Sequence, residues 1–425
     1  MSDDAAWLIQ DAWRHSPLRR RSRGVGSAGV PNASLPAFAP SAPEPASHGP
    51  ASPPPRGPPP PPPTAEPARP KPHTTTMSTD LVEHVAKRPR TELIIPATSV
   101  TAGNAQLSLY DDDDDDEEPR TSGLQAPIML LTGQEAAVYA FSFGPTGEFA
   151  ASGGAERAIY LWEVYGDCAN YNVLRGHKNA VLELSWLRDG RTLASASADK
   201  SVALWDCHAG KRKKKYAGHG GVVNAVRAAR SEDTLVSGGD DGCCVLWDAR
   251  ERRSVKTLAG DYAVTAVCFD EDASRVFAGG LEESVKCWDL RMDDVVYELR
   301  GHADTITGLS LSPDGTKLLS NAMDAKLHCW DVQPVAGEDR LLTTFVGHQH
   351  DFHKNLLRCS WSSDGEKVAC GSSDQVVHVW DVATAEELYY LPGHKGSVNE
   401  VDFHPKEPIL GSASSDKTVY LGEIA

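Results

Sequence analysis

Seven times between Gly133 and Glu423 the chain repeats the same three features in the same order. Each copy opens with Gly-His or a variant of it, continues to a turn that holds an acidic residue, and ends with Trp-Asp or a variant. Successive copies begin roughly 41 to 46 residues apart. A repeat of this length cannot bury its apolar face alone, so neighbouring copies must stack against one another. The chain therefore specifies an array of similar units, not an irregular globular fold.

Within each repeat, apolar segments of strand length alternate with turns rich in Gly, Asp and Ser. Residues 222–226, 234–238 and 245–248 of the third repeat are three such segments. This pattern and the period predict an all-β fold, a seven-bladed β-propeller over residues 122–425. The chain ends just after the third strand of the last blade. We expect residues 127–131, which precede repeat one, to supply the missing fourth strand and close the ring.

The repeated dipeptides resemble the WD-repeat family. The resemblance implies that a His, a Ser, the turn Asp and the Trp of a complete repeat form one buried hydrogen-bonded chain, in which Trp donates and the carboxylate accepts. Three repeats carry all four residue types: His177, Ser195, Asp199 and Trp205; His219, Ser237, Asp241 and Trp247; and His302, Ser320, Asp324 and Trp330. Because the set recurs at the blade period, we interpret it as structural and not as a hydrolase triad.

Four repeats depart from this pattern, so we expect local stability to vary around the ring. The replacements are Gln134 and Glu156 in repeat one, Asp261, Ala278 and Glu282 in repeat four, Cys370 in repeat six and Gly422 in repeat seven.

Stretches outside the general motif resemble a narrower family, the WD-repeat subunits of the U-five small nuclear ribonucleoprotein of the spliceosome. These stretches are residues 125–131, 164–168, 318–324, 355–361 and 420–424. The resemblance implies a non-catalytic, nuclear scaffold subunit that supports pre-mRNA splicing. Its partners would be the large central protein of the particle and the particle's helicase, and any contact with RNA would be secondary.

Charge and composition agree with a protein-binding scaffold. Residues 122–425 carry 30 Lys and Arg against 43 Asp and Glu, a net charge of −13. Nucleic-acid affinity comes largely from Lys and Arg that displace counterions, so an acidic propeller is a poor binder of phosphate backbones. The cysteines lack the spacing of a zinc site and indicate a reduced compartment. We expect no cofactor, no metal, no small-molecule substrate and no membrane segment.

Residues 1–121 hold 22 of the 29 Pro and are predicted to be a disordered tail. The run Pro58 to Pro63 is interpreted as a solvated spacer, with a ligand for an SH3 or WW domain as the alternative. The acidic run 111–118 is read as a linker, or else as a docking segment. Lys87, Arg88 and Arg90 form a candidate nuclear-import signal. The composition changes near Met77, which is a possible true start of the protein.

The starts of the inner strands and the tight turns of a propeller ring its central channel on one face, and we expect partners to bind there. By repeat position this rim includes Tyr139, Asn224, Asp240, Leu281, Thr307, Met323 and Leu357. Tyr139 and Met323 are the expected anchors, because aromatic and Met side chains are enriched in interface cores.

Three further features leave alternatives open. The basic run 211–215 is expected on a solvated outer strand, with RNA or an acidic partner as the alternative. The insertion around His348, His350 and His353 is read as a partner-contacting loop more readily than as a metal site. Arg250 and Arg291 end Trp-Asp-x-Arg tetrapeptides, which in other propellers dock substrate receptors onto cullin–RING ubiquitin ligases. A ligase adaptor is therefore the competing function.

Overall fold

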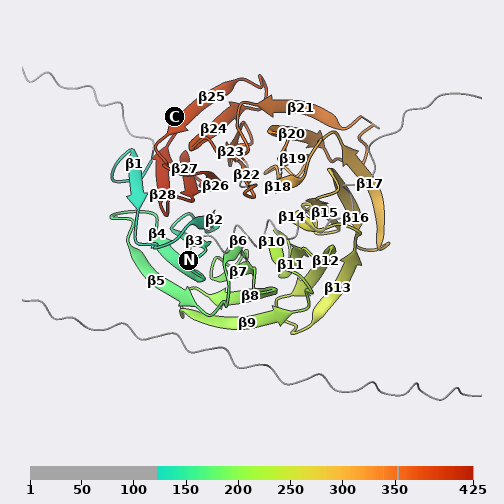
Figure 1. Cartoon of the computed structure of the whole chain (residues 1–425), viewed down its shortest axis with the longest axis horizontal. Coiled ribbons are helices and arrows are strands. Elements are labelled where there is room, and N and C mark those ends of the chain that lie inside the picture. The colour runs from blue at the N-terminus through green and yellow to red at the C-terminus, as the bar shows by residue number, and fades with distance from the viewer. Residues whose placement is uncertain (1–121, 338, 352–353, 425) are drawn as a thin grey trace, which may run out of the picture. The chain divides into compact units, whose positions relative to one another are not determined.

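The computed structural model describes residues 122–337, 339–351 and 354–424, and every regular element in these ranges is a β-strand. The strands form seven antiparallel four-stranded sheets, arranged as blades in a ring (Figure 1). The predicted seven-bladed propeller is thus confirmed. In the part of the chain that the structure describes, no helix is long and apolar enough to cross a membrane. The predicted tail, with its candidate import signal and Met77, lies outside the described residues.

Each blade runs from an inner strand at the ring axis to an outer strand at the circumference. The inner strands are β2 (Val138–Phe143), β6 (Val181–Trp186), β10 (Val223–Ala228), β14 (Val264–Phe269), β18 (Ile306–Leu311), β22 (Cys359–Trp361) and β26 (Val398–Phe403). The second strands are β3 (Phe149–Gly154), β7 (Thr192–Ser197), β11 (Thr234–Gly239), β15 (Arg275–Gly280), β19 (Lys317–Ala322), β23 (Lys367–Gly371) and β27 (Ile409–Ser414).

The third strands carry the Trp-Asp dipeptides or their variants. They are β4 (Ala158–Glu163), β8 (Ser201–Asp206), β12 (Cys243–Asp248), β16 (Ser284–Asp289), β20 (Lys326–Asp331), β24 (Val376–Asp381) and β28 (Val419–Glu423). The outer strands are β5 (Asn170–Arg175), β9 (Lys211–Ala217), β13 (Ser254–Ala259), β17 (Asp294–Arg300), β21 (Leu341–Val346), β25 (Glu387–Pro392) and β1 (Ile128–Leu131).

The strand β1 closes the ring, as the sequence predicts. It pairs antiparallel with β28, Ile128 opposite Gly422 and Leu131 opposite Val419. The blade that ends the chain is therefore completed by the segment that precedes the first blade. In this arrangement β28 has a partner on both sides.

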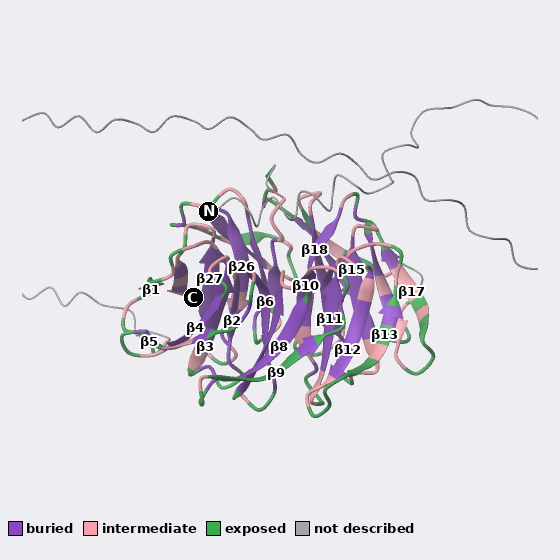
Figure 2. Ribbon diagram, turned by 60° about the horizontal axis from the view of Figure 1, so that its bottom comes forward, coloured by how far each residue is buried: buried purple, intermediate pink, exposed green. Residues whose placement is uncertain are grey.

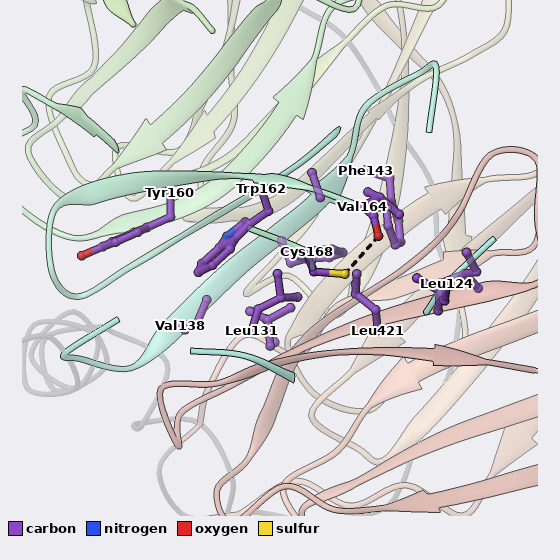
Figure 3. Packing of buried hydrophobic residues seen from close by; sticks show 14 of the residues in the cluster. Leu124, Leu131, Val138, Phe143, Tyr160, Trp162, Val164, Cys168 and Leu421 are labelled. Atoms are coloured by element: carbon purple, nitrogen blue, oxygen red, sulfur yellow. Dashed lines mark hydrogen bonds between the residues drawn. The ribbon is translucent and has the colours of Figure 1, made fainter. Parts of the chain in front are cut away.

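The apolar core is divided into seven clusters, and most of them join one blade to the next. Figure 3 shows the cluster at the closure, where Leu131 of β1 and Leu421 of β28 lie among Trp162 and Val138 of blade one. The inner three strands of the blades are largely buried, while the outer strands are partly exposed (Figure 2). Contacts between blades therefore hold the ring together and fix the geometry of its axis.

Six of the seven inner strands shift register after their first residue, which leaves one bulged residue without a partner on the second strand. Four bulge side chains donate a hydrogen bond to a backbone carbonyl of the next blade: Asn224 to Val264, Thr265 to Ile306, Thr307 to Leu357 and Asn399 to Val138. A bulge re-aims a side chain, and here it aims the side chain at the neighbouring sheet. The bulges are therefore ties between blades.

Candidate functional site

The complete repeats contain the expected chain of side chains. In blade two, Ser195 Oγ accepts a hydrogen bond from Trp205 Nε1 at 2.8 Å and contacts His177 Nε2 at 2.7 Å, while His177 Nδ1 lies 3.2 Å from Asp199 Oδ2. Blades three and five repeat the contacts to the serine at the same distances. In those blades the imidazole lies 3.0 Å from Asp241 and 3.3 Å from Asp324. Each chain ties the second strand, the third strand and the turn between them to the start of the blade.

The serines of these chains are not positioned for nucleophilic attack. Ser195, Ser237 and Ser320 are 0 % exposed, so no substrate carbonyl reaches their hydroxyls. Each hydroxyl oxygen also accepts a hydrogen bond from a Trp indole. A triad needs an accessible nucleophile beside an oxyanion site, and a fully enclosed one has neither.

The aspartates remain ionised although they are partly buried. Burial by itself raises the pKa of Asp199, but hydrogen bonds from His177, from Ser201 and from the Lys178 N–H outweigh it and hold the pKa well below its usual range. The same balance lowers the pKa of Asp324 to about 2. A carboxylate with several donors favours its charged form. These aspartates are the acceptors on which the chains end.

We predict that Asp199→Ala destabilises the protein by ~1–3 kcal/mol, because it leaves buried donors unpaired. Glu156 of the imperfect first repeat accepts from the Glu135 N–H and Tyr160 only, so Glu156→Ala is expected to cost less. Urea unfolding followed by tryptophan fluorescence compares the two variants. A larger loss of stability for Glu156→Ala than for Asp199→Ala would mean that the complete hydrogen-bonded chains do not stabilise the ring more than the incomplete one.

Two imperfect repeats rebuild the chain with other groups. In blade one, Gln134 Nε2 donates to Ser152 Oγ at 2.6 Å, in the place of the usual imidazole. In blade seven the Trp is absent, yet His394 still contacts Ser412 at 2.9 Å and Asp416 at 3.1 Å. A missing motif residue therefore does not imply a missing network.

The other two imperfect repeats, in blades six and four, lack the hydrogen-bonded chain. In blade six, Cys370 replaces the Ser, and among the described residues neither ring nitrogen of the buried His348 has a hydrogen-bond partner. In blade four, Ala278 and Asp261 stand in place of Ser and His, and they line a small hollow of about 30 Å³. Glu282 there pairs with Lys286 at 2.6 Å. These two blades are therefore packed differently from the complete ones, and the expected variation of local stability stays a prediction.

The unpartnered His348 makes acid stability testable. Burial, with repulsion from His350 and His378, lowers its pKa to about 3, whereas an unfolded His titrates near 6.5. Between these values the unfolded chain binds more protons, so the stability from His348 is present above pH ~6.5 and is lost as the pH falls toward 3. The free energy of unfolding should fall between pH 6.5 and 4.5, and we predict that this fall is smaller by roughly 2 kcal/mol in His348→Leu than in the unchanged protein. The exposed His208 provides a matched control, His208→Leu, and urea midpoints across this range measure both; equal slopes for the two variants would refute the prediction.

The predicted rim is only partly available to a partner. Asn224, Thr307 and Leu357 are 4 %, 0 % and 1 % exposed, so the expectation that their side chains line an open rim is wrong. Asn224 and Thr307 occupy bulge positions that point to the next blade, and the carbonyl of Leu357 accepts from Thr307 at 2.8 Å. The other four, Tyr139, Asp240, Leu281 and Met323, are partly exposed.

A charged group that the repeat pattern does not indicate lies at the ring axis. Arg358, 1 % exposed, precedes β22 and donates to the backbone carbonyls of Asn224, Thr265 and Thr307 at 2.7 to 2.9 Å. It thus joins blades three, four, five and six. Its guanidinium also lies 3.8 Å from Glu183 of blade two. Gly308 makes room for this arrangement, since a Cβ there would meet the Arg358 Cα at 3.1 Å.

The remaining sequence features lie at the circumference. Lys213 and Lys215 of the basic run contact Asp206 and Asp199 of their own blade at 3.5 and 3.3 Å, as expected for an outer strand. Arg250 is exposed and pairs with Asp233 at 3.0 Å, and Arg291 is exposed as well. His348 and His350 lie with their rings 5.8 Å apart. His353 and Phe352 of the same loop lie outside the described residues.

Exposed apolar side chains gather on the outer strands of the later blades. Ile128 and Leu130 of β1 are 66 % and 49 % exposed, and Leu342, Val346 and Tyr390 of β21 and β25 are 52 %, 61 % and 59 % exposed. Single exposed apolar residues are normal on a surface. The strands β21, β25 and β1 each carry two or more such side chains, whereas β5, β13 and β17 carry one each, so this part of the circumference is a second candidate contact surface.

Comparisons with known proteins agree with this architecture. The family model "WD domain, G-beta repeat" (WD40) matches seven segments, residues 125–163, 169–206, 210–248, 252–289, 293–331, 339–381 and 385–421. The chain is 50 % identical over 340 residues to the mouse (Mus musculus) U5 small nuclear ribonucleoprotein 40 kDa protein, covering 80 % of this chain and 95 % of that protein. It is 50 % identical over 339 residues to the human (Homo sapiens) protein of the same name, with the same coverage. The pre-mRNA-splicing factor cwf17 of Schizosaccharomyces pombe is 43 % identical over 72 % of this chain and 90 % of its own length.

Proposed function

Because the chain belongs to the family of the U5 small nuclear ribonucleoprotein 40 kDa proteins, within the WD40-repeat proteins, we propose that it is a scaffold subunit of that particle and supports pre-mRNA splicing. The observation that carries the proposal is the extent of the similarity. Half of the residues are identical over 340 residues, which cover 80 % of this chain and 95 % of the relative. The name of the fission-yeast relative, a pre-mRNA-splicing factor, points the same way.

The subunit acts by binding proteins and catalyses no reaction. The Ser, His and Asp of each complete blade are the residue types of a hydrolase triad, but here they are enclosed and support the fold. The ring carries a net charge of −13, so proteins and not RNA backbones are its main partners. We assign it to the nucleus, bound to the large central protein of the particle and near the particle's helicase.

The proposed contact residues are the accessible members of the rim. Tyr139 and Met323 are the anchors. Asp240 of blade three and Leu281 of blade four are further contact residues on the same face. Burial raises the pKa of the Tyr139 phenol, in agreement with a ring that is only half exposed. A half-buried aromatic side chain adds apolar area at little cost in conformational entropy.

Affinity purification of the tagged full chain from nuclear extract, followed by mass spectrometry, tests the proposal. We expect the U5 proteins to dominate the co-purifying set, and Tyr139→Glu with Met323→Glu to reduce their recovery. Val255→Glu is the matched control, since Val255 is 63 % exposed on the outer strand β13. Circular dichroism establishes that each variant is folded.

The same purification separates the competing function. Recovery of cullin–RING ligase subunits in place of splicing proteins, lost on Arg250→Ala with Arg291→Ala, would identify a ligase adaptor. Undiminished recovery of splicing proteins by the Tyr139 and Met323 variant would place the interface elsewhere, with the exposed apolar side chains of β21 and β25 as the next surface to change.

A further inference from the structure

A cavity of about 400 Å³ lies at the ring axis, lined by residues from five of the seven inner strands or their following turns. Its lining includes the ends of these strands and the turns after them, such as Asp402, Pro313 and Ser362, and Glu400 lies farther in. It therefore opens at the face opposite to the predicted rim. Arg358 and the bulge side chains lie toward the rim. The volume falls at the lower end of the range for ligand pockets, which suits one or two side chains.

The cations around this axial cavity already have partners. Arg227 lies 3.2 Å from Glu183, and Arg230 lies 3.0 Å from Glu271 and donates to backbone carbonyls as well. The two terminal nitrogens of Arg358 donate to three carbonyls, and its guanidinium lies 3.8 Å from Glu183. The two arginines that line the cavity, Arg227 and Arg230, are therefore already paired with carboxylates, while the buried Nε of Arg358 has no hydrogen-bond partner among the residues that the structure describes.

The two carboxylates of the cavity differ from each other. Asp402 accepts hydrogen bonds from the Phe143 N–H at 2.9 Å, from Ser142 and from Ser360. Glu400 is 4 % exposed, its Oε2 has no hydrogen-bond partner, and no ion pair joins it to a cation within the described ranges. The three arginines face four carboxyl groups in all, so one carboxyl group lacks an arginine of its own. A buried carboxylate oxygen without a donor is costly, and such groups call for a specific explanation.

The walls of the cavity suit an aliphatic stem that ends in a cation. Phe141, Trp361 and Phe403 contribute aromatic surface to the lining. Lys and Arg bury their methylene chains along apolar surface while the charged head reaches a polar group. Burial raises the pKa of Glu400 well above its usual value, although Arg227 and Arg358 lower it in part. This agrees with a carboxyl that lacks a close cationic partner.

We propose that the axial cavity binds the side chain of an arginine or lysine from a protein partner, with the cation held by Glu400 at the ring axis. The partner enters from the face that carries the turns after the inner strands. This inference adds a second binding face and a class of recognised side chain to the proposed function. It does not depend on which assembly the chain enters, because the charge and shape of the cavity belong to the chain alone.

Calorimetric titration of the full chain with N-acetyl-arginine amide tests the inference directly. We expect saturable binding with one site per chain, and weaker binding of N-acetyl-glutamine amide and N-acetyl-glutamate amide. Glu400→Gln is expected to weaken binding of the arginine amide by about tenfold or more, the loss of one charge-assisted hydrogen bond. Glu386→Gln, on an exposed turn before β25, is the matched control and should bind as the unchanged protein does.

A second variant covers the case in which Glu400→Gln does not fold. Ser363 is exposed at the edge of the cavity, so Ser363→Trp narrows the mouth without disturbing the interior, and it should weaken binding as well. Tighter binding of the glutamate amide, equal binding of all three amides, or no saturable binding of any would overturn the proposal. Because these probes are small molecules, such a failure leaves the purification test of the scaffold function unaffected.

Discussion

Arg358→Met is expected to destabilise the ring by about 3–5 kcal/mol, the usual cost of removing one partner from a buried charged network. Arg358 donates to carbonyls that belong to three blades other than its own. Met fills a similar volume but donates nothing, so those carbonyls lose their partner in the interior. The charge of Glu183 also loses a neighbouring cation. Since the contacts span four blades, the loss should appear in the unfolding of the whole ring.

Urea unfolding, followed by tryptophan fluorescence and by circular dichroism, measures this effect. Arg250→Met is the matched control, because Arg250 makes an exposed ion pair with Asp233 and should leave the midpoint unchanged. Equal midpoints for the two variants would show that Arg358 does not tie the blades together. A shift seen by only one of the two probes would show that the loss is confined to part of the ring.

Removal of residues 1–132 should cause a large loss of stability or aggregation, whereas removal of residues 1–121 should leave the ring folded. The longer deletion takes away β1, which is the only partner of β28 on its outer side. It exposes that strand edge and uncovers the cluster shown in Figure 3. Melting temperatures of the two truncated proteins compare them, and equal values would show that β1 does not close the ring.

A pair of single substitutions in β1 separates packing from strand pairing. Leu131 is 3 % exposed in the closure cluster, and Leu131→Ala is expected to cost about 2–4 kcal/mol. Its neighbour Leu130 is 49 % exposed, and Leu130→Ala should stay within about 0.5 kcal/mol. Similar losses for both would mean that β1 does not hold its observed register.

The ring and its closure were predictable because they follow from strong local signals. The seven repeats predict seven blades, and the expectation that residues 127–131 complete the last blade is confirmed by the pairing of β1 with β28. The complete networks were also predictable, because the resemblance to the WD-repeat family implies them in repeats that carry all four residue types. What spacing did not show is that Gln134 takes the place of His in blade one and keeps a contact to Ser152.

The candidate site was harder to predict, because its side chains contact residues of other blades that are brought together only when the ring closes. Asn224 and Thr307 sit at inner-strand starts, as the repeat pattern indicates, but a bulge turns their side chains into the next blade. Nothing in the local pattern marks the bulge. Arg358 and Glu400 did leave a signal, since Arg358 is a charged residue directly before β22 and Glu400 is a charged residue within β26. Their meaning required the structure: Arg358 meets Thr265 and Asn224, which lie 93 and 134 positions away in the sequence.

The most direct test of the proposed function is the recovery of U5 small nuclear RNA with the protein itself. The tagged full chain is purified from nuclear extract under mild salt, and the co-purifying RNA is quantified against the other small nuclear RNAs. If the chain is a subunit of the particle, U5 RNA should be strongly enriched and should sediment with the protein as one large complex. Recovery of U5 RNA at the level of an untagged extract, with the protein sedimenting apart from it, would contradict the proposal.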